Sequence, residues 1–344
     1  MTKSIGQTFR SDLAGPIALA GLSQISHIAA LTEGLSNQNF HIKGLHHSKL
    51  VESDWVLRLN SRASSQICDR SAETLAWQAA CRANLAPKVV YISPDKDIYL
   101  SEYIQQNPDN LWGDLSCENG ANQSRLHEAV KPGAERLLLD LLQGLKQLPA
   151  PSNIIGVDKQ WQVYYTRLCN MQQRLVKLEK LCYPNSQVWL QQFNTLIEQQ
   201  RQIDTMLLTL ERCLVKLQYS HRDLNPHNIL IVQNKLNCID FEYACSSHPL
   251  CDLASVLASH ALSSQQQQWL IKHYLQQHSN LNHHALNAVP AAVDLYWVFA
   301  VCWALQMAFD AIELNHPDKL SSNSKASSYL NYAAKYQRLI RSAK

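Results

Sequence analysis

The side chains best suited to chemistry are three oxygen-bearing residues in one short stretch: Asp223, Asn228 and Asp240. A hard cation such as Mg²⁺ takes a few protein oxygens, while phosphate oxygens and water complete its octahedron. Asn228 and Asp240 are therefore predicted to hold magnesium. Asp223 lies five residues before Asn228, where it can receive the proton of an incoming hydroxyl group. An aspartate is a weak base, which suffices when a loose transition state leaves most of the catalysis to positioning and charge neutralisation.

A short hairpin is expected to position these side chains. The apolar run 229–232 is followed by a polar, turn-prone segment at 233–235 and by a second apolar run that ends at Ile239. Two strands joined by a tight turn fit this pattern. Asn228 would then stand at the entrance of the hairpin and Asp240 near its exit, so that both side chains converge on one point.

Glu242 extends the acidic part of this site. Residues two apart in an extended segment point to the same side, so Asp240 and Glu242 present two carboxylates on one face. This arrangement suits one or two magnesium ions. A polar loop beside an ordinary hairpin is the alternative interpretation, but the whole combination at these spacings favours phosphoryl transfer.

The order His221-x-Asp223, then Asn228, then 240–244 (Asp-Phe-Glu-Tyr-Ala) resembles the catalytic hairpin of the kinase-like phosphotransferases. Protein kinases carry glycine where this chain has Glu242. The pattern is instead similar to choline and thiamine kinases, within the aminoglycoside phosphotransferase group. This resemblance implies an α+β, bilobal, protein kinase-like fold that binds ATP and Mg²⁺. We expect a β-rich nucleotide-binding lobe at 1–105 and a mainly helical catalytic and substrate-binding lobe at 106–344.

The same resemblance assigns the residues that contact the nucleotide. Gly34, Ser36 and Asn37 correspond to a short loop over the phosphates, although alone they indicate only a hairpin turn. Arg58 interrupts the strand-like run 55–59 and would grip the phosphates, and Glu73 would pair with it. An edge arginine that extends into solvent and an exposed helix glutamate are the alternatives for these two.

Further roles follow from position within the family pattern. Backbone groups of Glu102 and Ile104 would contact adenine at the hinge. His221 and Asp252 would support the catalytic loop, and Asp252 would brace it through hydrogen bonds. Asp252 could at the same time stabilise the N-terminus of a helix, because the helix dipole favours an acidic side chain there.

Aromatic residues are the candidates for substrate recognition. Tyr296, Phe299 and Trp303 share one helix face because they fall at i, i+3 and i+7. Such faces are usually core, but aromatic walls also attract quaternary or thiazolium cations. Choline kinases cage their substrate ammonium with aromatics from C-terminal helices, and Tyr243 would add to such a wall.

The composition of the chain argues against nucleic-acid binding, membrane insertion and a zinc site. The 344-residue chain has a formal net charge of +3 and no basic run, so nucleic-acid binding is not indicated. No apolar run approaches the roughly 20 residues that cross a bilayer, and the first residues lack a signal-peptide core; we therefore expect a cytoplasmic protein without membrane insertion. Ten irregularly spaced cysteines favour reduced thiols over a zinc site. Oligomeric state has no signal in the sequence.

These observations converge on an ATP-dependent kinase of a small cationic alcohol, of the choline or thiamine type. An aminoglycoside kinase is the second hypothesis; it predicts an acidic substrate cleft. A nucleotide-binding regulator without catalysis is the third, and the complete set of Asp223, Asn228 and Asp240 argues against it.

The remaining expectations concern secondary structure. Residues 1–30 are expected to be a helical preamble, and long helical patterns cover 160–182 and 186–217. The tract 263–268 is expected to be a polar linker into the next helix. A helix is predicted to begin at Asp69-Arg70, and residues 107–134 are expected to form a loop or short helices.

Overall fold

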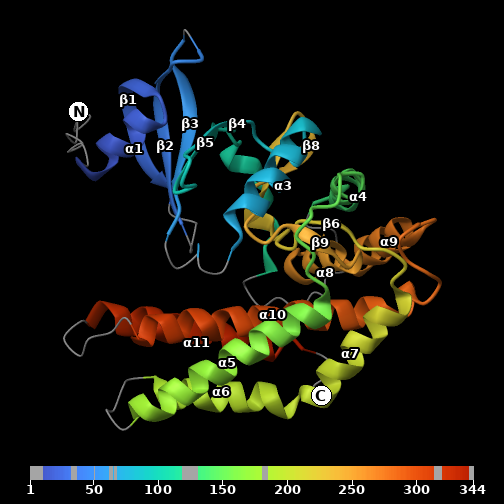
Figure 1. Cartoon of the computed structure of the whole chain (residues 1–344). Helices are drawn as coiled ribbons and strands as arrows, with labels where there is room; N and C mark the ends of the chain where they lie inside the picture. Colours follow the sequence, from blue (N-terminus) through green and yellow to red (C-terminus); the bar gives the residue numbers. More distant parts are fainter. Residues whose placement is uncertain are drawn as a thin grey trace. The chain divides into compact units, whose positions relative to one another are not determined.

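The computed structural model describes residues 11–31, 37–49, 51–61, 65, 68–117, 131–179, 185–313 and 320–340. They fall into two compact units, Met1–Asp114 with His227–Ala244, and Leu115–Pro226 with Cys245–Lys344. Figure 1 shows the sheet of the first unit in blue to teal and the helices of the second in green to red. The chain therefore leaves the first unit after Asp114 and returns to it for the hairpin that carries Asp240 and Glu242.

An antiparallel sheet of five strands forms the centre of the first unit, in the order β1-β2-β3-β5-β4. The strands are β1 (Leu22–Leu31), β2 (Gln38–His46), β3 (Ser53–Leu59), β4 (Val89–Ile92) and β5 (Ile98–Glu102). Because neighbouring strands run antiparallel, turns suffice to join β1 to β2 and β2 to β3. The strand pair that Gly34, Ser36 and Asn37 indicated is thus present as β1 and β2.

Period-two alternation decides which face of this sheet is buried. Phe40 and Ile42 on β2 point to the same side as Trp55 and Leu57 on β3, and all four are buried. The helical turn η1 (Ser11–Leu13) and helix α1 (Ala14–Leu19) cover this apolar face with Leu13 and Ile17. Arg58, one residue on from Leu57, consequently points to the opposite face.

Helix α3 (Arg70–Arg82) supplies the second element of the site. Asp69 caps it, because its carboxylate accepts hydrogen bonds from the backbone amides of Ser71 and Ala72. The predicted helix start is confirmed. Glu73, Ala76 and Ala80 are buried at helix spacing, so Glu73 faces inward.

The predicted hairpin is also confirmed. Strands β7 (Ile229–Val232) and β8 (Lys235–Cys238) pair in register, and Gln233 and Asn234 both have positive φ, as a two-residue type I′ turn requires. Gln106 anchors the hairpin to the first unit, since its side chain exchanges two hydrogen bonds with the backbone of Ile231.

The second unit is mainly helical. The 3-10 turns η2 (Pro108–Asn110) and η3 (Trp112–Leu115) precede the helices of this unit in the chain, and the turn η6 (Pro226–Asn228) directly precedes the β7–β8 hairpin of the first unit. The helices of the second unit are α4 (Ala134–Lys146), α5 (Val157–Glu179), α6 (Ser186–Glu198), α7 (Gln200–Cys213), α8 (Leu250–Ser259), α9 (Ser264–Leu275), α10 (Ala285–Glu313) and α11 (Leu320–Gln337). Two short strands, β6 (Gln218–Ser220) and β9 (Cys245–Ser247), pair antiparallel beside α8.

Helix α10 is the core helix of this unit. It packs along α11 and also against α7 and α8 (Figure 1). Its length and apolar composition alone would let it cross a bilayer, contrary to the sequence expectation, but a mostly buried core helix passes the same test, and 56% of its most apolar stretch is buried. Membrane insertion therefore gains no support from α10.

Three secondary-structure expectations are wrong. Residues 22–31 are strand β1, whose edge position gives it no clean alternation; pairing with β2 decides its structure. The pattern 186–217 is two helices that meet at Gln199: α6 packs on α5, α10 and α11, whereas α7 packs mainly on α10. The tract 263–268 begins α9, since Ser263 and Gln266 form a capping box.

Trp189 offers a direct test of the helical core. Its side chain is fully buried, its indole Nε1 donates to the Leu305 carbonyl at 2.7 Å, and Phe193 and Phe309 flank its ring. Trp189→Ala is expected to lower the free energy of unfolding by about 3–5 kcal/mol, measured by urea denaturation. Its exposed neighbour provides the control: Val188→Ala should change this value by less than about 1 kcal/mol. Equal effects of the two substitutions would contradict the assigned packing.

Candidate functional site

A cluster of buried charges surrounds Arg58 in the first unit. Arg58 is 8% exposed, and its guanidinium contacts three carboxylates. Nη2 lies 3.1 Å from Glu73 and 3.5 Å from Glu242, while Nη1 lies 3.1 Å from Asp240. The ion pair expected between Arg58 and Glu73 is therefore present. Its role in phosphate binding stays a prediction.

Glu73 connects two arginines. One of its carboxylate oxygens faces Arg58, and the other lies 2.7 Å from Nη1 of Arg70. The Tyr99 hydroxyl donates a third contact to Glu73 at 3.2 Å, and the Tyr99 ring lies under the Arg58 guanidinium. A carboxylate that is 1% exposed needs such partners, because an unpaired buried charge is costly.

Glu242 is held by three nitrogen donors. Its Oε2 lies 3.3 Å from the amide of Asn37, 3.5 Å from Arg58 and 3.7 Å from Arg70. Asn37 in turn accepts hydrogen bonds through Oδ1 from Arg70 and from the backbone amide of Ser61. Asn37 is thus tied to the acidic cluster in addition to its predicted place in the phosphate loop. Gly34 and Ser36 lie outside the described residues.

Arg70 is the residue that sequence reasoning missed. It is buried and contacts Glu73, Glu242 and Asn37. A signal existed, since Arg70 lies three residues before Glu73 at the start of the same helix, where side chains three apart are neighbours. The contacts with Asn37 and Glu242 had no counterpart in local sequence.

Electrostatics within this cluster favour the charged forms of the arginines. Burial by itself lowers the pKa of Arg58, but the carboxylates of Asp240, Glu73 and Glu242 outweigh burial and raise it. Burial raises the pKa of the neighbouring Cys68 thiol, and the charge of Glu242 adds to this effect. Arg58 therefore remains a permanent cation, while Cys68 remains a neutral thiol.

Asp240 is the most accessible acid of the cluster. Its side chain is 29% exposed, and its backbone has φ +65°, a left-handed conformation that aspartate tolerates better than most residues. On the facing side of the hairpin, the Asn228 carbonyl accepts a hydrogen bond from the Ile239 amide at 2.9 Å. The backbones of Asn228 and of the residue before Asp240 are therefore adjacent, as the hairpin model of a shared cation requires.

Asp252 braces the catalytic loop in the second unit. It is 2% exposed and accepts hydrogen bonds from the Ser220 hydroxyl at 2.8 Å and from the backbone amides of His221 and Arg222 at 3.0 and 2.7 Å. These are the bracing contacts that the family resemblance implies. They hold Arg222 at φ +68°, a conformation that is strained for a long side chain.

Asp223 follows directly on this braced turn. Its backbone amide donates to Nδ1 of the fully buried His221, and one carboxylate oxygen accepts from the Asn225 amide at 2.9 Å. The side chain is half-buried, so it is not sealed in the core. Asn225, which the sequence interpretation left without a role, fixes the orientation of the proposed base.

The hinge positions lie at and after the end of β5. Glu102 is the last residue of this strand, pairs with Trp55 across the sheet and contacts Lys49 through its side chain. Ile104 follows outside any helix or strand and is half-buried. Adenine recognition by their backbone groups stays a prediction.

The aromatic residues expected to bind substrate have separate neighbours. In the second unit, Tyr296 lies edge-on to Trp297, Phe299 stacks with Tyr164 and Trp303 lies edge-on to Tyr329. Tyr243 belongs to the first unit. The sequence interpretation expected Tyr164 to be a core residue and did not include Tyr329; the packing of α5 and α11 on α10 identifies both as partners of these aromatics.

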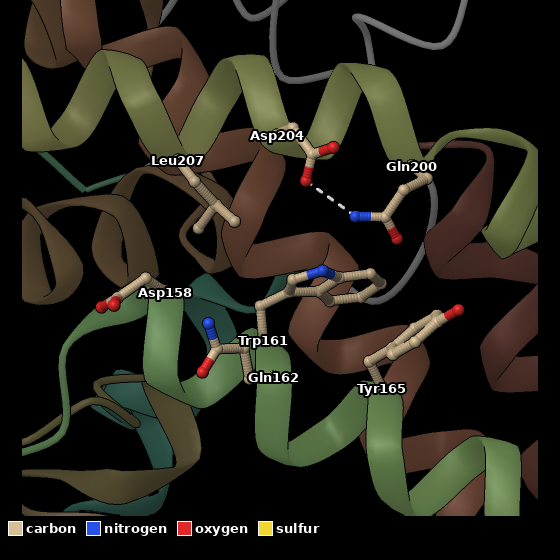
Figure 2. A pocket seen from close by; sticks show the side chains of 7 residues that line it. All are labelled: Asp158, Trp161, Gln162, Tyr165, Gln200, Asp204 and Leu207. Carbon is tan, nitrogen blue, oxygen red and sulfur yellow. Dashed lines mark hydrogen bonds between the residues drawn. The ribbon is translucent and has the colours of Figure 1, made fainter.

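The second unit also contains a shallow pocket of about 390 Å³ between α5 and α7 (Figure 2). Trp161 forms its floor, with Asp158, Tyr165, Gln200 and Asp204 around it. None of the residues predicted from the sequence lines this pocket. Its two aspartates are exposed, and the Gln200 amide donates to Asp204 at 2.7 Å.

Within the part of the chain that the structure describes, no group of three or more histidine, cysteine, aspartate or glutamate side chains could hold a metal ion. The predicted magnesium ligands are a smaller set, two carboxylates and one amide. Such a set suits an ion that keeps waters and phosphate oxygens in its shell.

Comparisons with known proteins address the fold and family. Residues 27–289 match the phosphotransferase enzyme family. Protein LicA of Haemophilus influenzae is 21% identical over 250 residues, which are 71% of this chain and 61% of that protein. The chain thus spans about three fifths of the length of this relative.

Solved structures resemble this chain over most of its length, and two of them represent different kinases. Choline kinase LicA from Streptococcus pneumoniae has a TM-score of 0.56 at 14% identity, covering 94% of this chain and 98% of that one. The streptomycin–ATP–APH(2")-IIa ternary complex has a TM-score of 0.54 at 16% identity, covering 94% and 96%. At such identities the likeness concerns the fold, and the expected α+β, kinase-like fold is confirmed.

Buried histidines near the catalytic loop make stability sensitive to acid. Burial lowers the pKa of His248 to about 4, partly offset by its hydrogen bond to the Leu210 carbonyl, and lowers that of His260 to about 3. Below pH 6.5 the two imidazoles become protonated in the unfolded chain but stay neutral in the folded protein. The free energy of unfolding is therefore highest above pH 6.5 and decreases as the pH falls towards 4.

We therefore expect the free energy of unfolding to drop between pH 6.5 and 4.5. His248→Gln should reduce the slope of this drop by about 1.4 kcal/mol per pH unit, in urea denaturation series at several pH values. The exposed His284 offers a matched control, since His284→Gln should leave the slope unchanged. An unaltered slope in the His248 variant would contradict a buried neutral imidazole.

Proposed function

Because this chain belongs to the phosphotransferase enzyme family, we propose that it transfers the γ-phosphoryl group of ATP to the hydroxyl of a small cationic alcohol. Choline and thiamine represent the favoured substrate class. The observation that carries this proposal is the convergence of Arg58, Asp240, Glu242 and Glu73 in one buried cluster. Such a cluster combines a fixed cation for phosphate with carboxylates for a divalent metal ion.

The residues present fit ATP and magnesium. Arg58 presents a guanidinium that is oriented by Glu73 and can form paired hydrogen bonds with phosphate oxygens. Asn228, Asp240 and, for a second ion, Glu242 would hold magnesium, which when bound neutralises charge on the transferred phosphoryl group. Asp240 is the accessible member of this set, whereas Glu242 is enclosed by Asn37 and the two arginines. Gly34, Ser36 and the backbone of Glu102 and Ile104 complete the proposed nucleotide contacts.

Asp223 is the proposed base. Asn225 and the His221-braced backbone fix its carboxylate, so that one oxygen can accept a hydrogen bond from the substrate hydroxyl and receive its proton as the phosphoryl group transfers. His221 and Asp252 are support residues, because their contacts fix the loop backbone. Asn228 lies five positions after this base in the sequence.

Substrate recognition is assigned to aromatic side chains. Tyr296, Phe299 and Trp303 on α10 would attract a quaternary ammonium or thiazolium group through their π faces, and Tyr243 of the first unit is a further candidate for such a contact. The half-buried state of all four leaves part of each ring accessible. The likeness to a choline kinase supports this class, and a cytoplasmic location, where ATP is supplied, belongs to the same proposal.

Aminoglycoside phosphorylation is the second candidate. The likeness to the streptomycin–ATP–APH(2")-IIa complex favours it. Polycationic sugars require several carboxylates, and the α5–α7 pocket offers Asp158 and Asp204. A nucleotide-binding regulator would need neither Asp223 nor its brace, and their presence disfavours that function.

A substrate panel separates these functions. ADP release would be followed with Mg²⁺–ATP and, in turn, choline, ethanolamine, thiamine or kanamycin. Choline or thiamine is expected to accelerate ADP release by at least tenfold over the background hydrolysis. Acceleration by kanamycin alone would favour the aminoglycoside function. Nucleotide binding without acceleration by any member would contradict the proposed kinase of a cationic alcohol.

Asp223→Asn tests the base. The amide keeps the shape and the Asn225 contact but cannot take up a proton, so kcat should fall by about 10²–10⁴-fold. The dissociation constant for ATP should stay within about twofold, measured by titration calorimetry. Asp140→Asn, an exposed aspartate on α4, is the control and should leave kcat unchanged. A variant of Asp223 with full turnover would exclude its catalytic role.

A further inference from the structure

Arg70 is a second buried arginine in the first unit and has no role in the reaction described above. It is the first residue of α3, directly after the N-cap Asp69, and is 9% exposed. An arginine at the start of a helix is not placed there by helix electrostatics, because the N-terminal end of the helix dipole favours acidic side chains. Its position calls for an explanation from its contacts.

The guanidinium of Arg70 reaches four partners. Nη1 lies 2.7 Å from Glu73 and 3.7 Å from Glu242, Nη2 donates to Asn37 at 3.3 Å, and Nε donates to the Ser65 hydroxyl at 3.1 Å. Two of these partners, Glu73 and Glu242, are also partners of Arg58. Arg70 and Arg58 therefore share the same two carboxylates: they contact different oxygens of Glu73 and the same oxygen, Oε2, of Glu242.

The sharing has a consequence for charge. The cluster contains two arginines and three carboxylates, so it carries one net negative charge. Without Arg70, a single guanidinium would face three carboxylates in a site that is almost closed to water. Arg58 would then be the only cation for Glu73 and Glu242, and its contacts with them would strengthen at the expense of any anion that approaches it.

We propose that Arg70 is a positioning residue that neutralises Glu73 and Glu242 and so leaves the Arg58 guanidinium available to nucleotide phosphates. This inference rests on the proposed function, since it specifies how the same cluster admits an anion. Arg70 acts through Arg58 and does not itself contact the nucleotide.

The role has a signature that loss of structure would not reproduce. Removing one positive charge should weaken the binding of an anion and strengthen the binding of a divalent cation at the same cluster. A locally collapsed site would bind both ligands less well. Nucleotide without metal and metal without nucleotide are therefore the two probes to compare.

The test uses the full chain and the substitution Arg70→Gln. ADP binding in the presence of EDTA, measured by calorimetry, is expected to weaken about tenfold, which equals about 1.4 kcal/mol. Mn²⁺ binding without nucleotide, measured by electron paramagnetic resonance, is expected to tighten at least threefold. Arg82→Gln, on the exposed last turn of the same helix, is the matched control and should change neither constant.

The Arg70→Gln protein could fail to fold, because the substitution leaves two buried carboxylates with only one cationic partner. A second variant keeps the test decisive in that case. Glu242→Gln removes one of these carboxylates. In the Glu242→Gln protein, adding Arg70→Gln should again weaken ADP binding in EDTA by about tenfold. Thermal unfolding of both proteins would establish that each is folded at the assay temperature.

Several results would overturn the inference. ADP affinity within twofold of wild type in both Arg70 variants would do so, and so would a parallel loss of ADP and Mn²⁺ binding. Either result alongside kinase activity of the wild-type chain rejects the Arg70 role alone. A wild-type chain that binds no nucleotide and consumes no ATP rejects the proposed function, and the Arg70 inference falls with it.

Discussion

The compensation of buried charge in the first unit is the constraint on which the site depends. Glu73 and Glu242 are almost fully removed from water, and a carboxylate in that position requires a charged or hydrogen-bonding partner. Arg58 and Arg70 both supply a charged partner to each of these carboxylates, and Asn37 and Tyr99 add neutral donors. Strand β3 and helix α3 must therefore pack so that both arginines reach the same two acids.

Two turns with unusual backbone conformations lie at the proposed base and at the proposed metal ligand. Arg222 and Asp240 both have positive φ, which costs free energy in residues other than glycine. Three hydrogen bonds to Asp252 hold the first turn, and the ion pair with Arg58 holds the second. Supports of this kind would keep the proposed base and metal ligand in place before a ligand binds, which is how positioning contributes to catalysis.

The sequence alone determined the local parts of this protein. The spacing of Asn228 and Asp240 indicated a hairpin, because the two short apolar runs between them are joined by a turn-prone segment and can pair locally. Asp69 marked a helix start because an N-cap acts within three residues. Alternation along β2 and β3 separated a core face from the face of Arg58, since side-chain direction in a strand depends only on position.

The tertiary structure decided everything that joins distant segments. The contact of Asn37 with Glu242 spans 205 positions, and the role of Arg70 follows only when Glu242 lies beside it. Strand β1 has no clear pattern of its own, and pairing with β2 defines it. The break at Gln199 follows from what α6 and α7 pack against. Periodicity and capping act over one or two turns of chain, whereas these contacts depend on which surfaces the folded chain brings together.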